Sequence, residues 1–390
     1  MSTAPPVAHE TGDTSGASHY PWLLCTANTC GICGDSTGGT IRTGESAVSE
    51  ADLTLIHALQ LAPRASWAQL AAEVGHSPGT LNRRWARLTE AGVAWSGVLP
   101  GAMFDGGTTL CSAWIQVRCG AGSVAATAAE LARDPGTLCV VHLAGAADLL
   151  VYYACYDTTA LDRYLGERLH LLPGVRATRA HLITKMHGPL SPLRLHQLGP
   201  DIRRRLSALA PSPSPGAARQ DGLPDATDRV LLHALAGDAR LGATVLAKAC
   251  GLSETTVRRR IDRLEARSGL HYMVKLAPRY TSRPLLGFLY LNVPPEQVTQ
   301  TAATVLRQRG TRHVSSVTGP HNLLVCAWLR SPAQLAEYAE RLTRAVPAVR
   351  VTETTLALRI QKLGGQILAP DGTRERFVAP DLWGTDPHAR

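Results

Sequence analysis

The stretch 225–268 combines apolar residues at helical spacing with a glycine stop between helices. A helix is predicted over 225–236 and a second over 243–250, which ends at Gly251, a residue that readily adopts the left-handed conformation of a helix end. Ser253 is well placed to cap a third helix, whose apolar stripe consists of Val257, Ile261 and Leu264. Short helices joined by a tight glycine turn are typical of a helix-turn-helix.

The same pattern occurs earlier in the chain. An offset of 176 residues aligns 52–88 with 228–264, and 15 of these 37 positions are identical. In the first copy Ser77 is the predicted cap, Pro78 takes the tolerated first helical position, and the stripe is Leu81, Trp85 and Leu88. Downstream the best offset becomes 174, so the repeat is a whole module of about 140 residues present twice.

Arginines lie on the third helix of both copies. At about 100° per residue, Arg259 and Arg263 point away from the apolar stripe, as do Arg83 and Arg87 in the first copy. Such a helix can enter the major groove of DNA, where guanidinium groups reach phosphates or guanine edges. The residues predicted to contact DNA are Ser77, Thr80, Arg83, Arg84, Arg87, Ser253, Thr255, Thr256, Arg259, Arg260 and Arg263. A merely solvated arginine face is the competing interpretation, and finding the pattern twice weakens it.

After each helix-turn-helix, apolar alternation predicts strand, helix, strand, strand, helix, strand. In the second copy these segments are 285–293, 297–309, 313–318, 322–329, 332–345 and 349–362. In the first copy they run from about residue 109 to 186, with helices near 124–133 and 159–171. This βαββαβ order predicts a ferredoxin-like sandwich, whose sheet keeps one face free for a partner.

The order of elements, the segment LSETTVRRRIDRLE, the hairpin GAADLLVYY and the ending LPGVRATRAHLITK together resemble the leucine-responsive/asparagine-regulator (Lrp/AsnC, feast-or-famine) family of transcription factors. The resemblance covers about 49–188 and 225–363. It implies an α+β chain with two repeats of a winged helix-turn-helix plus a RAM-type βαββαβ sandwich. It also implies that the sandwich dimerises and binds amino acids or related molecules, and that the partners are double-stranded DNA and such an effector.

The hairpin of each sandwich departs from the family pattern of glycine–x–tyrosine–aspartate. It reads Gly145-Ala146-Ala147-Asp148 in the first copy and Gly319-Pro320-His321-Asn322 in the second. The residues predicted to bind the effector are Gly145, Asp148, Gly319 and Asn322. A carboxylate accepts strong hydrogen bonds from an ammonium group, so the site at Asn322 is expected to be the weaker one.

The predicted organisation is a tail (1–48), helix-turn-helix 1 (49–98), sandwich 1 (107–188), a linker with one short helix near 201–210 (189–224), helix-turn-helix 2 (225–274), sandwich 2 (284–363) and a C-terminal tail (364–390). The duplication predicts that the two sandwiches pair within one chain and imitate a homodimer, from which larger homo-oligomers could be built. A flexible linker of about 36 residues reaches roughly 30–36 Å, enough to join neighbouring small domains.

Composition adds a basic balance and a compartment. The net charge is +9 and the pI about 9.3, which favours an anionic partner such as nucleic acid. The nine cysteines are scattered, with several in apolar segments, which is typical of a reducing cytosol. No apolar run reaches the roughly 20 residues of a membrane span and no export signal is evident, so we expect a cytoplasmic protein without a membrane partner.

Two other kinds of site were weighed. His19, Cys25, Cys30 and Cys33 could be written as a zinc set, but the surrounding tail lacks hydrophobic partners, and we expect neither metal nor cofactor. His57 and His233 recur on the first helix, where a packed or capping role is expected. The competing function is an enzyme similar to siroheme decarboxylases of the same duplicated architecture, which would use His142, His181, His187 and His313. These histidines do not recur at equivalent repeat positions, so we expect a regulator that is not an enzyme.

Overall fold

The computed structural model describes residues 48–100, 110–188, 194–210, 224–268 and 270–382. Each helix-turn-helix unit consists of three helices and a wing strand. The first contains α1 (Glu50–Leu61), α2 (Trp67–Val74), α3 (Pro78–Glu90) and β1 (Ala94–Pro100), and the second α7 (Ala226–Gly237), α8 (Ala243–Cys250), α9 (Glu254–Ser268) and β6 (Leu270–Leu276). The predicted three-helix order is confirmed in both copies.

The two sandwich units, called sensor units below after the effector role predicted for them, have the predicted βαββαβ order. The first contains β2 (Cys111–Cys119), α4 (Val124–Arg133), β3 (Thr137–Ala144), β4 (Leu149–Cys155), α5 (Thr158–Arg163), a π-helical turn (Tyr164–Leu169) and β5 (Val175–Met186). The second contains β7 (Leu285–Asn292), α10 (Val298–Leu306), β8 (Thr311–Val317), β9 (Leu323–Leu329), α11 (Ala333–Ala345) and β10 (Arg350–Leu363). Short 3₁₀ turns lie at Pro278–Tyr280 and Pro295–Gln297.

The eight sensor strands form one closed sheet, so the two sandwiches pair within the chain as predicted. Their order is β10-β3-β4-β2-β5-β8-β9-β7, and β7 pairs back with β10. The inter-unit pairs are antiparallel: β5 with β8, and β10 with β3. Closure matters physically because each sheet would otherwise present an unpaired edge and an uncovered apolar face.

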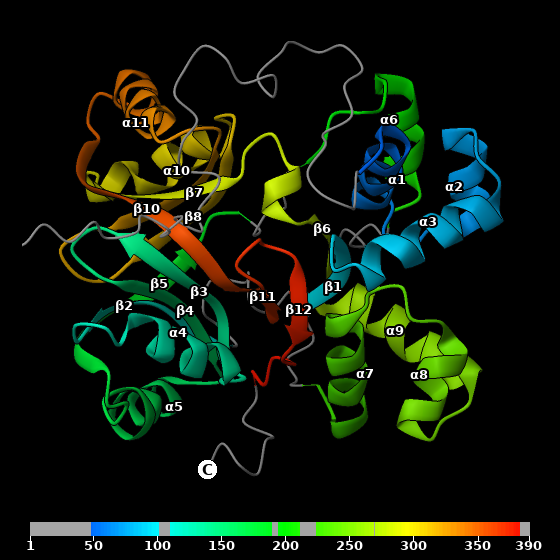
Figure 1. The fold of residues 1–390 in the computed structure, drawn as a ribbon, viewed down its shortest axis with the longest axis horizontal. Coiled ribbons are helices and arrows are strands. Elements are labelled where there is room, and N and C mark those ends of the chain that lie inside the picture. Colours follow the sequence, from blue (N-terminus) through cyan, green and yellow to red (C-terminus); the bar gives the residue numbers. More distant parts are fainter. Residues whose placement is uncertain (1–47, 101–109, 189–193, 211–223, 269, 383–390) are drawn as a thin grey trace, which may run out of the picture.

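Strand alternation divides the core around the barrel into an inner cluster and two outer ones. On β2, Trp114 belongs to the inner cluster, where its ring lies 5.8 Å from that of Phe288, whereas Ile115 belongs to the outer cluster. The helices α4, α5, α10 and α11 lie on the outside of the barrel, at the left of Figure 1, and the two helix-turn-helix units lie together at the right. Period-two alternation therefore fills the barrel with side chains from both units.

The C-terminal segment differs from the predicted tail. It forms a hairpin with β11 (Gln366–Leu368) and β12 (Arg374–Phe377), and β11 extends the sheet from β10. Gly364 and Gly365 form the two-residue turn between β10 and β11, with φ of +63° and +83°, as the primed hairpin turns require. The Arg374 amide donates to the Gly92 carbonyl at 2.8 Å, which attaches the hairpin to the first helix-turn-helix.

The linker is partly structured. Its predicted helix is present as α6 (Pro200–Ala208), and Leu206 is fully buried in the core that includes α1. His57, 2% exposed, accepts the amides of Gln197 and Leu198 at 3.0 and 3.2 Å. The packed role predicted for His57 is therefore confirmed, and residues 194–209 lie against α1 instead of forming a free tether.

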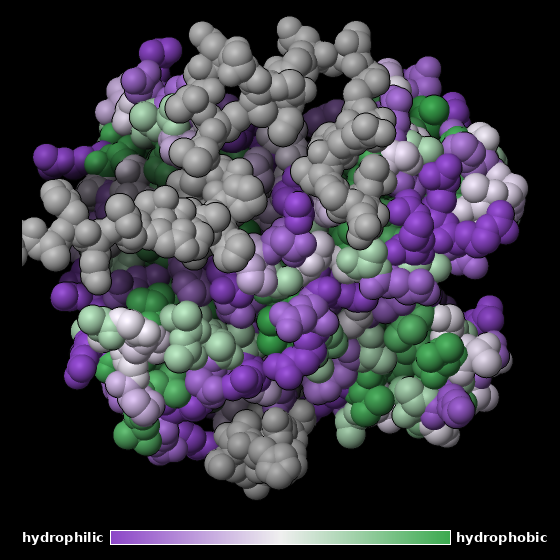
Figure 2. All heavy atoms as spheres, in the orientation of Figure 1, coloured by the Kyte–Doolittle hydropathy of each residue, from purple (hydrophilic) through white to green (hydrophobic). Residues whose placement is uncertain are grey.

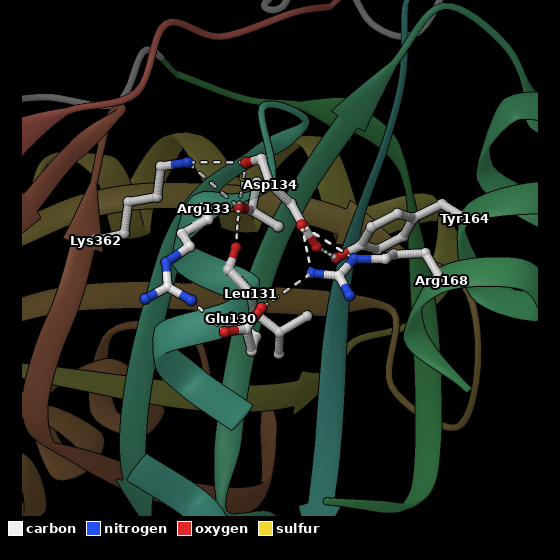
Figure 3. Close-up of polar contacts among 8 residues, drawn as sticks. Glu130, Leu131, Arg133, Asp134, Tyr164, Arg168 and Lys362 are labelled. Atoms are coloured by element: carbon white, nitrogen blue, oxygen red, sulfur yellow. Dashed lines mark hydrogen bonds and ion pairs between the residues drawn. The ribbon is translucent and has the colours of Figure 1, made fainter. Parts of the chain in front are cut away.

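A polar cluster fastens the last sensor strand to the first unit (Figure 3). The Lys362 ammonium of β10 donates to the Asp134 carbonyl at 2.9 Å, just after α4. The Asp134 carboxylate accepts from Arg168 at 2.8 Å and from the Tyr164 hydroxyl at 3.1 Å. The buried lysine thus has a carbonyl partner and a nearby carboxylate.

Among the helices of the described residues, none combines the length and the apolar character that a membrane span requires.

Candidate functional site

The recognition helices α3 and α9 begin as the sequence predicts. Gly75 and Gly251 end the preceding helices in the left-handed conformation, with φ of +73° and +65°. Ser77 Oγ accepts the Thr80 amide at 3.2 Å, and Ser253 Oγ accepts the corresponding Thr256 amide at the same distance. These caps fix where each helix starts and therefore which residues its outer face presents.

Four of the predicted DNA-contacting arginines form ion pairs inside their own unit. In the first unit Asp52, 1% exposed, accepts from Arg84 at 3.1 Å and from Arg87 at 2.6 Å. Burial alone would raise the pKa of Asp52, but hydrogen bonds from Ser49, Arg87 and Arg84 lower it overall. In the second unit Asp228 pairs with Arg260 and Arg263 in the same way.

The distances in the second unit show that this is a repeated design. Arg260 lies 2.7 Å and Arg263 2.8 Å from Asp228 carboxylate oxygens. The expectation that Arg87 and Arg263 simply point away from the packed face is therefore incomplete, because both reach back to the first helix of their unit. The carboxylates of Asp52 and Asp228, on the first helix of each unit, set the direction of these arginine side chains. A helical projection of the third helix alone does not include those carboxylates. All four arginines remain partly exposed and keep a share of their surface for a phosphate.

Arg83 and Arg259 are the arginines that face outward. Both are exposed, and neither forms an ion pair with a described residue. Their neighbours Asn82 and Arg258 are exposed too, and Arg258 lies 3.2 Å from the Glu254 carboxylate. Hydrophilic side chains gather over α2 and α3 at the right of Figure 2, so this face is polar.

The two helix-turn-helix units are joined through their wings and through a reciprocal pair of arginines. Strands β1 and β6 pair antiparallel over their whole length, with Ala94 opposite Leu276. Arg64 donates to the Ala239 carbonyl at 2.8 Å, and its repeat counterpart Arg240 donates to the Pro63 carbonyl at 2.6 Å. Burial lowers the pKa of Arg240 to about 10. Both repeat positions hold arginine, and each guanidinium binds a backbone carbonyl of the other unit.

The polar residues of the predicted effector hairpins are engaged by the chain itself. The Asp148 carboxylate accepts the Cys119 amide at 2.7 Å. The Asn322 amide accepts the Val293 N–H at 3.0 Å and donates to its carbonyl at 2.6 Å. Each side chain therefore holds the hairpin to the end of the first sensor strand, a role that needs no ligand.

The glycines of the same hairpins lie at the junction of the two sensor units. A Cβ added at Gly145 would lie 2.8 Å from the Thr355 side chain of the second unit. At Gly319, where φ is +108°, it would lie 2.9 Å from His181 of the first unit. The hairpin of each unit therefore packs on the last strand of the other, and small residues permit that close approach.

Replacing Asp148 with alanine is expected to lower the free energy of unfolding by about 1–3 kcal/mol, because the partly buried Cys119 amide loses its charged acceptor. Asp148→Asn is the matched control, since Asn322 shows that an amide fits this place. Chemical denaturation of both variants measures the effect. If Asp148→Ala keeps full stability but loses stabilisation by amino acids, the residue binds the effector instead.

The four histidines of the enzyme alternative are distributed over the barrel wall and junction. His313 and His181 are fully buried, and His313 lies 6.0 Å, ring to ring, from Trp114. Burial, Arg312 and His187 lower the pKa of His313 to about 3, so it is neutral. His181 Nδ1 is 3.0 Å from the Thr318 carbonyl, and His187 Nε2 is 2.7 Å from Ser316 Oγ. His142 is partly buried on β3.

No group of three or more histidine, cysteine or acidic side chains is arranged to hold a metal within the described ranges. The zinc set considered from sequence, His19 with Cys25, Cys30 and Cys33, lies outside the described residues.

Comparison with known proteins agrees with this architecture. The AsnC-type helix-turn-helix domain matches residues 49–89 and 225–265, and the Lrp/AsnC ligand binding domain matches residues 112–189. The HTH-type transcriptional regulator LrpA of Pyrococcus horikoshii is 26% identical over 140 residues, which are 36% of this chain and 98% of that protein. LrpA of Pyrococcus abyssi is 28% identical over 114 residues, 29% of this chain and 81% of the relative.

The structure is a duplicated chain in which two paired helix-turn-helix units are joined to one closed barrel. Its helix-turn-helix segments and first barrel unit are similar to those of Lrp/AsnC transcription regulators, and the helix-turn-helix match occurs twice. Among solved structures, the siroheme decarboxylase NirDL matches with a TM-score of 0.53 at 16% identity, covering 81% of this chain and 93% of that one. Its complex with an iron-uroporphyrin III analogue matches with a TM-score of 0.54 at 15% identity, covering 85% and 95%. These two matches show a shared duplicated fold.

Proposed function

We propose that this chain is a cytoplasmic regulator that binds duplex DNA sequence-specifically with α3 and α9, and that a small-molecule effector in the sensor barrel alters this binding. The observation that carries the proposal is the pairing of two capped recognition helices, each with an exposed arginine, through one shared wing sheet. A single chain therefore presents the two-headed arrangement that a homodimer normally provides.

The two heads are expected to read different half-sites. At equivalent positions of the recognition helices, Asn82 stands against Arg258 and Gly79 against Thr255. Asparagine favours adenine and arginine favours guanine at major-groove edges, so the operator is expected to be asymmetric. Assembly of several such chains into a larger homo-oligomer is compatible with this arrangement.

Alanine substitution of Arg83 and Arg259 tests the proposal. Each is expected to weaken specific binding by about 1–3 kcal/mol if it reads a base, or to reduce the salt slope by about 1 if it contacts a phosphate. Fluorescence anisotropy with a selected operator and a random duplex, at several salt concentrations, separates the two. Arg344→Ala, an exposed arginine on α11 of the sensor unit, is the control. Wild-type protein that binds the operator no better than random DNA would contradict the proposal.

The enzyme alternative gains no specific support from these side chains. The likeness to siroheme decarboxylase concerns the fold. Three of the histidines on which that alternative depends are engaged inside the chain: His313 lies beside Trp114, His181 contacts a backbone carbonyl and His187 contacts a hydroxyl oxygen. We therefore propose a regulator and not an enzyme. We propose that the effector is an amino acid or a similar small molecule, because residues 112–189 match the Lrp/AsnC ligand binding domain.

A further inference from the structure

A small cavity lies where the sensor barrel meets the shared wing sheet. Strands of the barrel contribute Trp114, Cys139, Tyr152 and Arg312, the wings contribute Leu99 and Lys275, and Leu138 and Gly364 complete the lining. The volume open to the centre of a water molecule is about 10 Å³. A space of this size suits a single water-sized group, such as a small ion or one oxygen atom of a carboxylate.

The cavity wall carries buried positive charge that no described carboxylate balances. Arg312 is 5% exposed, its Nη1 atom has no hydrogen-bond partner, and it forms no ion pair within the described residues. Its neighbours include the ring of Trp328, 5.9 Å from the guanidinium carbon, the thiol of Cys326, which shares a hydrogen bond with it, and another cation, Lys275. The other neighbours are Cys139, Tyr152 and His313, none of which is a carboxylate. A buried, unpaired cation is costly, so this arrangement calls for an anion.

Lys275 strengthens the same conclusion. It is partly buried on β6 with no ion pair among the described residues, and a Cβ at Gly364 would lie 2.6 Å from its Nζ. Burial, with the neighbouring Arg312, lowers the pKa of Lys275 to about 7, and no carboxylate opposes that shift. Trp114, 1% exposed, adds an indole N–H without a partner. The cavity thus offers donors and positive charge together.

Other buried cations in the described chain have acceptors. Lys362 donates to the Asp134 carbonyl (Figure 3), and Arg240 donates to the carbonyls of Pro63 and Ala65. Arg283 donates to the Trp328 carbonyl and to the Gln334 side chain. The shortage of acceptors around Arg312 is therefore a local feature and not a general habit of this arginine-rich chain.

We propose that this cavity is an anion site, in which Arg312 and Lys275 bind a small inorganic anion or the carboxylate of an effector. Because Lys275 and Leu99 belong to β6 and β1, occupancy ties the sensor barrel to the strands that join the two helix-turn-helix units. An anion at this place therefore adjusts how the recognition helices are held. This regulatory consequence rests on the proposed DNA binding, whereas the anion site itself does not.

Thermal unfolding without DNA tests the site. The full-length protein is prepared in chloride-free sodium methanesulfonate, whose anion is not a carboxylate, and titrated with chloride, acetate or phosphate at constant ionic strength, so that the three arms distinguish halide, carboxylate and phosphate. Wild type is expected to show a saturable rise in Tm with at least one of them, because a ligand that binds the folded state stabilises it by mass action. Arg350→Met, which removes an exposed arginine, should behave as wild type.

Arg312→Met and Lys275→Met should lose the saturable rise. Arg312→Met should also unfold at a higher temperature than wild type in methanesulfonate alone and at a lower one at saturating anion, because it removes both the uncompensated charge and the site. Destabilisation of Arg312→Met by the same amount at every anion concentration would overturn the proposal, as would a wild type insensitive to all three anions. If Arg312→Met fails to fold, Lys275→Met gives the same test.

DNA binding provides a separate measurement. At fixed ionic strength, the stabilising anion should change the operator Kd of wild type by about five-fold or more and leave that of Lys275→Met unchanged. An anion that raises Tm without changing Kd would overturn the regulatory coupling. A wild type without specific DNA binding would contradict the proposed function, and the Tm measurements would then still test the anion site by themselves.

Discussion

Lowering the pH from 7 to 5 is expected to cost up to about 4 kcal/mol of unfolding free energy, with His57 and His313 contributing about 2 kcal/mol each. Burial, together with His196, Arg203 and Arg194, lowers the pKa of His57 to about 4. Burial and the neighbouring Arg312 and His187 lower that of His313 to about 3. His57 accepts two backbone amides through Nδ1, which a protonated ring cannot do.

The sign follows from the direction of these shifts. Both pKa values in the folded state lie below the ordinary value of 6.5, so the unfolded chain binds protons more readily. The stabilisation is complete above about pH 6.5 and is lost as the pH falls toward 4 for His57 and toward 3 for His313. Urea denaturation at a series of pH values measures this dependence.

His57→Gln is the informative variant, because glutamine can accept a backbone amide without titrating. It should flatten the slope between pH 6.5 and 4 by roughly half, whereas His170→Gln, at an exposed histidine, should leave it unchanged. A stability profile that is flat between pH 7 and 5 in wild type would show that these histidines are not held neutral by the fold.

Replacing Asp52 with alanine should lower the free energy of unfolding of the first helix-turn-helix by about 3 kcal/mol. The change leaves Arg84 and Arg87 without their shared carboxylate and removes the α1 capping box formed with Ser49. The figure is discounted from that of a fully buried pair, because the two arginines are 31% and 48% exposed. Calorimetry should show a lowered transition for this unit.

Asp228→Ala is the matched change in the second unit, and Glu90→Ala, an exposed acid at the end of α3, is the control. Operator binding by Asp52→Ala should also weaken, since α3 loses its attachment to α1. If Asp52→Ala costs less than about 1 kcal/mol, the ion pairs are surface interactions, and Arg84 and Arg87 are as free for DNA as the sequence suggested.

Local sequence determined the elements of each unit because the forces that form them act over a few residues. Ser77 and Ser253 cap helices after glycine turns, and the βαββαβ order follows from alternation and helical spacing. The duplication also predicted that the two sensor units pair, since a second matching surface was available on the same chain. The glycine pair at 364–365, between Leu363 and Gln366, was a hairpin signal in the sequence, although this segment was predicted to be a tail.

Only the tertiary structure decided which side chains from distant segments meet. Asp52 and Asp228 each form ion pairs with arginines of the recognition helix in the same unit. The sequence showed that both repeat positions are aspartate, but it did not show that these arginines reach them. Arg64 and Arg240 clasp opposite units, and Arg312 and Lys275 converge on one cavity from strands of different domains. Periodicity gives the face on which a residue lies. Its partner depends on how separate elements pack, and no short stretch of sequence contains that information.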